Sequence, residues 1–133
     1  MRKVSKEIAK AFIENRRKTM GNSWTEIDDL DGAIYLHDNR IAWWENNHPD
    51  LNLSNNIHLC FSMCGWGTPT TRERLNSLFS LLFESDDVFI QQKNFAQWLT
   101  INNRQIEIDE HATYVLRCIY GDLFLDVPMR EVS

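Results

Sequence analysis

Three side chains near the middle of the chain have the residue types of a metal site or a nucleophile. His58, Cys60 and Cys64 alternate with apolar residues between positions 56 and 64, so one face of a strand would carry all three. Imidazole and thiolate groups bind zinc, and a thiol beside an imidazole can attack a substrate. Structural zinc sites take ligands in pairs on tight turns, and no spacing in the chain singles out a fourth ligand. We therefore expect small buried thiols here, with neither metal nor cofactor.

The other residue types that could support catalysis favour an unreactive chain as well. The carboxylates gather at 28–31 and 109–110, in segments that have the composition of solvated turns and lack the spacing of a calcium loop. With five glycines in the whole chain, no glycine-rich loop is present to hold a phosphate. We predict a protein that is not an enzyme, and a metal-dependent enzyme is the least favoured alternative.

Residue types that form binding surfaces are more prominent. A predicted hairpin would place aromatic and basic side chains on one face, as in protein-binding hot spots or in platforms for stacked bases. The alternative is that another layer covers this face, because tryptophan is mostly buried. The side chains on this face are Tyr35, His37, Arg40 and Trp44.

Two further places could bind a partner. Trp66 lies between two glycines, and its simplest role is a plug that packs its loop against the following helix. Arg72 and Arg74 open that helix, where cations are mildly unfavourable. They could bind an anion there, although Arg72 could also pair with a loop aspartate. The predicted binding residues are Tyr35, His37, Arg40, Trp44, Trp66, Arg72 and Arg74.

Two helices must position these residues. An apolar stripe predicts the first helix over 4–20, with Ser5 as its N-cap and Gly21 as its stop. The second helix covers 71–84, and Thr70 and Glu73 at its start have the spacing of a capping box.

The strands form the rest of the predicted fold. A turn at Asp38-Asn39 would pair Leu36 with Ile41 and Ile34 with Trp43. The order is α-β-β-β-α-β-β-β, an α+β class in which two main helices pack on an antiparallel sheet. The six strands of this order are 33–37, 40–44, 56–64, 88–92, 95–101 and 104–108, and 112–119 is predicted as a further strand.

Chain length, net charge and cysteine content limit the class of protein and the partners that it can bind. A chain of 133 residues predicts one domain, 1–133, with 109–133 as a C-terminal extension of undefined structure. The net charge is −5, which argues against broad non-specific binding of nucleic acid. We expect no secretory signal and no membrane partner, and three cysteines suit a reducing cytoplasm.

Several short motifs, in order, give the chain a family resemblance. It resembles a family of small accessory proteins encoded by tailed bacteriophages and prophages, over roughly residues 5–105. The resemblance implies a viral protein acting in a bacterial cytoplasm, and it implies no substrate. Departures from the pattern are the segment 45–56 and the residues after 108. The residues that carry the resemblance are Gly21-Asn22, Tyr35-Leu36-His37, Asn39, Ile41-Ala42, Gly65-Trp66, 68–76 and 98–103.

Two classes of function remain. The first is a non-enzymatic protein that binds and neutralises a host bacterial protein, in host takeover or counter-defence. The second is a module that sequesters a nucleotide signal or single-stranded nucleic acid on aromatic and arginine side chains. A free strand edge would also allow copies of the chain to pair, in a number that the sequence does not set.

Overall fold

A computed structural model describes residues 2–49, 56–84 and 86–126 of the chain. Two helices and two antiparallel sheets make up this part, which confirms the predicted α+β class. The elements in chain order are α1 (Lys3–Ile13), β1 (Thr19–Met20), β2 (Ser23–Asp28), β3 (Asp31–Leu36), β4 (Asn39–Trp44), β5 (Ile57–Ser62), α2 (Pro69–Leu82), β6 (Phe89–Lys93), β7 (Ala96–Ile101), β8 (Arg104–Ile108), β9 (Thr113–Ile119) and β10 (Asp122–Asp126).

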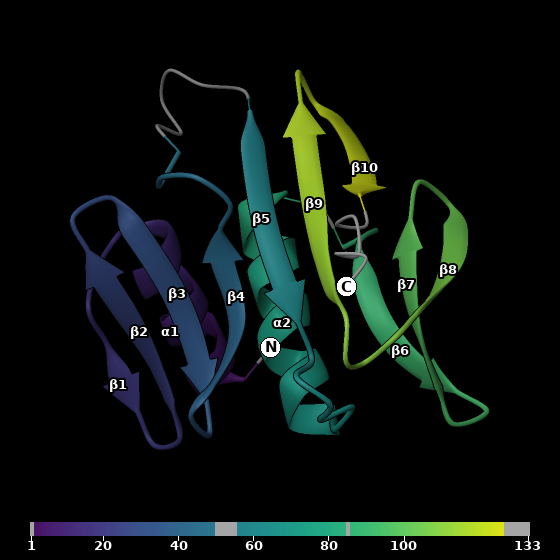
Figure 1. The fold of residues 1–133 in the computed structure, drawn as a ribbon, viewed down its shortest axis with the longest axis horizontal. Helices are drawn as coiled ribbons and strands as arrows, with labels where there is room; N and C mark the ends of the chain where they lie inside the picture. Colours follow the sequence, from purple (N-terminus) through teal and green to yellow (C-terminus); the bar gives the residue numbers. More distant parts are fainter. Residues whose placement is uncertain (1, 50–55, 85, 127–133) are drawn as a thin grey trace, which may run out of the picture.

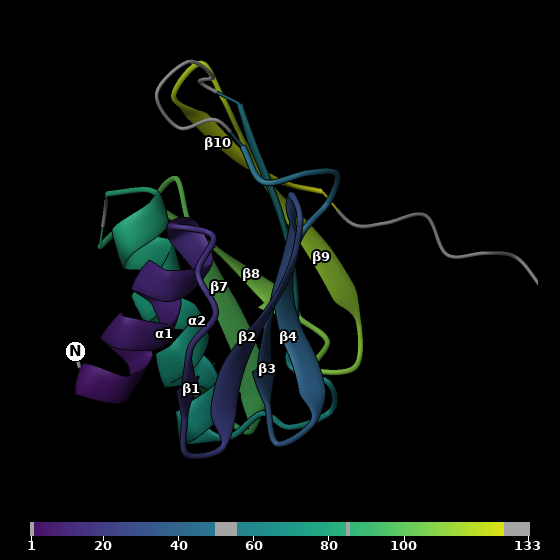
Figure 2. The same ribbon diagram turned by 90° about the vertical axis from the view of Figure 1, so that its left-hand side faces the viewer.

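The larger sheet has seven strands in the order β1-β2-β3-β4-β5-β9-β10. Both helices lie against one face of this sheet, and none of the described residues forms a helix on the opposite face (Figures 1 and 2). The smaller sheet, in the order β6-β7-β8, lies beyond β9 and β10 in Figure 1 and contacts α2 through β6.

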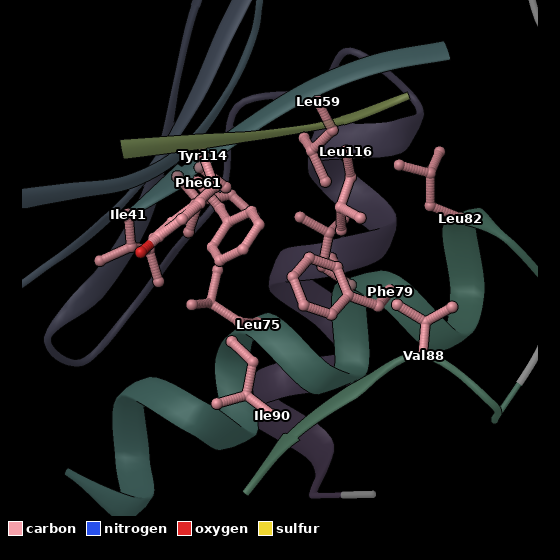
Figure 3. Packing of buried hydrophobic residues seen from close by; sticks show 14 of the residues in the cluster. Ile41, Leu59, Phe61, Leu75, Phe79, Leu82, Val88, Ile90, Tyr114 and Leu116 are labelled. Carbon is pink, nitrogen blue, oxygen red and sulfur yellow. The ribbon is translucent and has the colours of Figure 1, made fainter. Parts of the chain in front are cut away.

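The hydrophobic core lies on both sides of α2. Leu75 and Phe79 of this helix meet Phe61 and other side chains of the seven-stranded sheet, while Ile90 of β6 approaches the helix from the opposite side (Figure 3). Phe61 and Phe79 contact edge to face, with ring centroids 5.2 Å apart. The helix therefore packs against both sheets.

The first helix is shorter than the sequence predicted. It ends at Ile13 because Asn15 adopts a left-handed conformation with φ of +57°. The N–H of Arg16 then donates to the carbonyl of Ala11, and the N–H of Asn15 to that of Phe12, which is a Schellman motif. The residues after it form β1 and β2, where the sequence predicted helix and loop.

Both predicted helix caps are wrong. Ser5 lies inside α1 and is buried, and the N-cap is Arg2. In α2 the cap is Thr68, whose Oγ1 accepts the N–H of Thr71 at 3.2 Å, and Pro69 occupies the first helical position.

The C-terminal part is more regular than expected. β9 confirms the predicted strand 112–119, and β10 pairs with it through residues for which no structure was predicted. Positions 50–55, part of the segment that departs from the family pattern, and 127–133 lie outside the described residues.

Candidate functional site

The face of the seven-stranded sheet that points away from α1 and α2, here called the outer sheet face, carries a cluster of aromatic side chains. Trp24 of β2 pairs with Tyr35 of β3, and their rings stack with centroids 5.5 Å apart and planes 3° from parallel. On β4, the guanidinium carbon of Arg40 lies 3.9 Å from the ring centroid of Trp43. Arg40 is exposed, and the three rings are half-buried. The cluster therefore brings predicted residues Tyr35 and Arg40 together on an accessible surface.

Trp44 does not belong to this cluster, and its predicted place is wrong. The β3–β4 turn consists of His37 and Asp38, both with positive φ, rather than Asp38 and Asn39. The pairing runs from Tyr35 with Arg40 to Ile34 with Ala42, which leaves Ile41 as an extra residue in a β-bulge. The bulge turns Trp44 into the core, where it is 4% exposed and stacks on Phe12 with centroids 4.3 Å apart.

A charged network continues the outer sheet face across β5, β9 and β10. Arg117 donates to both carboxylate oxygens of Glu45, at 2.6 and 2.9 Å, and to Asp126 at 3.2 Å. The hydrogen bond with Glu45 raises the pKa of Arg117. The Nη1 of Arg117 also lies 2.8 Å from Nδ1 of His58. The imidazole thus contacts a guanidinium, which does not suit a metal ligand.

The charges around the aromatic cluster are mainly negative. A groove of about 690 Å³ is bordered by Tyr35, Arg40 and Trp43 and by four carboxylates. The basic residues along it are Arg17 and Arg40. Glu45 is paired with Arg117, so the other three carboxylates, against two arginines, leave the groove with a negative balance that favours cationic groups over phosphates. The carboxylates are those of Glu26, Asp28, Asp31 and Glu45.

His37 and Trp66 lie at a different place, around a cavity at one end of the molecule. The cavity measures about 490 Å³ and lies between the β3–β4 turn, the loop before α2 and the first turn of that helix. Trp66 is 60% exposed, so its predicted role as a buried plug is wrong. Many residues of the family resemblance border this cavity, including Leu36, Asn39, Ile41, Thr68 and Thr70.

The glycine before Trp66 explains this exposure. Gly65 has φ of +79°, and a Cβ atom there would lie 2.8 Å from the His111 ring. Its N–H donates to the carbonyl of Glu110 at 2.7 Å. Glycine therefore allows the loop to contact the β8–β9 connection closely, and the Trp66 ring lies at the surface.

The two arginines of α2 hold the fold together. Arg72 donates to the carbonyl of Gly67 at 2.8 Å and to the side chains of Gln92 and Gln97 at 3.1 and 3.3 Å. Arg74 donates to Ser5 at 2.6 Å and to Ser23 at 3.0 Å. These contacts occupy the guanidinium groups with protein partners, so a role in binding an anion remains only a prediction.

The thiols are placed for packing. Cys60 is buried, and burial together with the nearby Glu45 carboxylate raises the pKa of its thiol from 9.0 to about 11. A thiol with this pKa stays protonated at neutral pH and is a poor nucleophile. Cys64 Sγ donates to the carbonyl of Arg40 at 3.1 Å. Within the described ranges, no group of three His, Cys, Asp or Glu side chains could hold a metal ion.

Trp24 and Trp43 were not predicted from the sequence as binding residues. Trp24 alternates with Glu26 and Asp28 on one face of β2, opposite Ser23 and Thr25, and this period of two is the signal that could have identified the strand. Trp43 was placed on the face of Ile34, opposite that of Tyr35 and Arg40, because a regular hairpin was assumed. A one-residue bulge leaves no clear pattern in a single sequence.

Comparison with known proteins assigns the chain to a bacteriophage family. The family model of the Kyanoviridae Gp96 protein matches residues 1–117, which include both helices and the whole aromatic cluster. The chain therefore belongs to the Kyanoviridae Gp96 family, which confirms the predicted resemblance to phage proteins. No curated protein and no solved structure matches the chain. None of the described helices has the length and apolar character needed to cross a membrane.

Proposed function

We propose that this phage protein is a non-enzymatic binding protein that occupies a host bacterial protein through the outer sheet face. The observation that carries the proposal is the cluster of Trp24, Tyr35, Arg40 and Trp43 on a sheet face that neither of the described helices covers. Tryptophan, tyrosine and arginine are the residues on which binding energy is most often concentrated. Rings already stacked in the free protein lose little conformational freedom when a partner binds.

The charge of the groove supports a partner with a basic surface. Four carboxylates border it against two arginines, in a chain with a net charge of −5. Opposite charges speed the encounter between two proteins, and salt weakens this effect. We infer that the host protein presents Lys and Arg side chains, and that its capture is stronger at low salt. Neutralising the host protein, in takeover or counter-defence within the host cytoplasm, is the consequence that we propose for this binding.

Affinity capture with one pair of variants tests the proposal. Tagged wild-type protein, Arg40→Ala and Arg104→Ala are each incubated with host lysate at low salt. Both variants lose one arginine, but Arg104 lies on β8, outside the cluster. We expect Arg40→Ala to recover at least about tenfold less of the host protein, and Arg104→Ala to match wild type. A wild-type protein that recovers no host protein at low salt, or an Arg40→Ala variant with full recovery, contradicts the proposal.

A second candidate function uses the same rings. The stacked pair of Trp24 and Tyr35, with Arg40 over Trp43, would also suit a nucleotide signal or a single strand of nucleic acid. The carboxylates of the groove weigh against this candidate, because phosphates would approach like charges. Tryptophan fluorescence that is unchanged across a panel of oligonucleotides and cyclic nucleotides would remove it.

A further inference from the structure

The turn between β6 and β7 carries a phenylalanine that is not buried in the fold. The two strands pair Lys93 with Ala96, so Asn94 and Phe95 form a two-residue turn. The Phe95 side chain is 97% exposed, the highest value among the large exposed hydrophobic residues of the described chain. A ring so exposed gains almost nothing from burial in the folded protein.

The backbone of this turn is also unfavourable for phenylalanine. Asn94 has φ of +51° and Phe95 has φ of +66°, as a type I′ turn requires. Glycine and asparagine tolerate this region, whereas a bulky side chain in it is a genuine outlier. Strain of this kind persists where the surrounding structure imposes it, and it is concentrated at functional sites.

Other turns of the same chain provide an internal comparison. Among the described residues, three more two-residue turns connect paired strands with positive φ at both positions. Their second residues are Asp38, Asn103 and Gly121, which are types that this conformation favours. Only the β6–β7 turn, within the part of the chain described, places an aromatic side chain at the second position.

The surroundings of Phe95 are acidic. A depression of about 540 Å³ is bordered by Phe95 and by the carboxylates of Glu107, Asp109 and Glu110. The carboxylates make insertion into an anionic membrane surface unfavourable. They complement a protein surface whose apolar pocket is surrounded by Lys and Arg.

We propose that the β6–β7 turn is a docking anchor, in which Phe95 inserts into an apolar pocket with a basic rim on the host protein. The anchor rests on the proposed function, because it assumes that the chain binds a host protein. It lies on the smaller sheet and adds a contact to those of the outer sheet face. An aromatic ring fixed on a rigid turn needs little ordering when it enters a pocket.

Two turn variants test whether Phe95 serves binding rather than folding. Phe95→Asn gives the β6–β7 turn the Asn-Asn pair found at 102–103, and Asn103→Phe makes the reverse change in the β7–β8 turn. We expect Phe95→Asn to raise the thermal midpoint by roughly 2–4 °C and to recover at least about tenfold less host protein. Asn103→Phe lowers the midpoint by a similar amount and leaves recovery unchanged.

The outcomes separate the anchor from the proposed function. Equal recovery by wild type and Phe95→Asn overturns the anchor alone, whereas a wild-type protein that recovers nothing contradicts the proposed function. A Phe95→Asn variant that loses both stability and recovery also overturns the anchor, because Phe95 would then support the fold.

Cross-linking identifies what the ring contacts. A benzophenone amino acid is placed at position 95, or at position 103 as control, and the protein is irradiated in host lysate. We expect position 95 to label one host protein, in a peptide that contains apolar residues and nearby Lys or Arg. Labelling of lipid, of a second copy of this chain or of a peptide without basic residues overturns the proposal, as does equal labelling from position 103.

Discussion

Arg40 and Trp43 are three residues apart on β4, yet the guanidinium carbon of Arg40 lies 3.9 Å from the centroid of the Trp43 ring. In a regular strand, residues three apart point to opposite faces. The extra residue at Ile41 changes this alternation, so that both side chains lie on the outer sheet face and Trp44 enters the core. One bulge therefore decides which of two adjacent tryptophans can meet a partner.

Truncating the two adjacent tryptophans should lower stability by clearly different amounts. We expect Trp44→Ala to lower the free energy of unfolding by about 3–5 kcal/mol, because it removes a buried ring stacked on Phe12. Trp43→Ala should cost about 1 kcal/mol, since it loses mainly the contact with Arg40. Urea unfolding measures both values. Similar losses in the two variants would show that the bulge is not where we place it.

Trp43→Ala should also separate an effect on binding from an effect on stability. Trp43→Ala is expected to reduce recovery of the host protein while the chain remains folded, because its ring belongs to the outer sheet face. Recovery is compared below the unfolding midpoint of each variant. Full recovery by Trp43→Ala would remove this ring from the proposed interface.

The sequence was a good guide where apolar residues repeat regularly. Residues 56–64 alternate strictly, and β5 forms there with Leu59 and Phe61 in the core. The fold class and the second helix followed from similar patterns. The end of α1 could not be predicted from such a pattern. Asn15 ends the helix through a Schellman motif, although the residues after it still favour helix.

The candidate site was only partly predictable. Tyr35 and Arg40 were found because their types suit a binding surface. The face of the sheet on which Trp44 lies is set by a bulge. The side-chain partners of Arg72 are Gln92 and Gln97. Those glutamines belong to the smaller sheet, whose position relative to α2 is set by tertiary packing, which no local pattern encodes.

The cap of α2 gives a third prediction. Thr68→Ala should lower the free energy of unfolding by about 1 kcal/mol, because the N–H of Thr71 loses its acceptor. Thr70→Ala is the matched control, since Thr70 is exposed and lies two residues away. Thermal unfolding of the two variants measures the difference. A larger loss for Thr70→Ala would restore the capping box that the sequence suggested.

The contacts of Arg74 give a fourth prediction. Its guanidinium joins the two helices and β2 through Ser5, Glu73 and Ser23. Removing it leaves these polar groups without their shared donor, so Arg74→Ala should cost about 2 kcal/mol of unfolding free energy. Chemical unfolding checks this value, with Arg104→Ala as an exposed control that should change stability by less than about 0.5 kcal/mol. Equal effects would mean that the network contributes little.

The thiol of Cys60 makes stability depend on alkaline pH. Burial raises the pKa of this thiol from 9.0 to about 11, so the folded chain retains the proton that the unfolded chain loses above pH 9. The contribution is complete below pH 9 and is lost as the pH rises towards 11. Unfolding free energies measured at intervals from pH 8 to 11 should therefore fall more steeply for wild type than for Cys60→Ala. Other groups titrate in this range, but they are present in both proteins, so the difference between the two curves isolates Cys60. Parallel curves would mean that the thiol titrates alike in the folded and unfolded chains, and the buried environment assigned to Cys60 would be wrong.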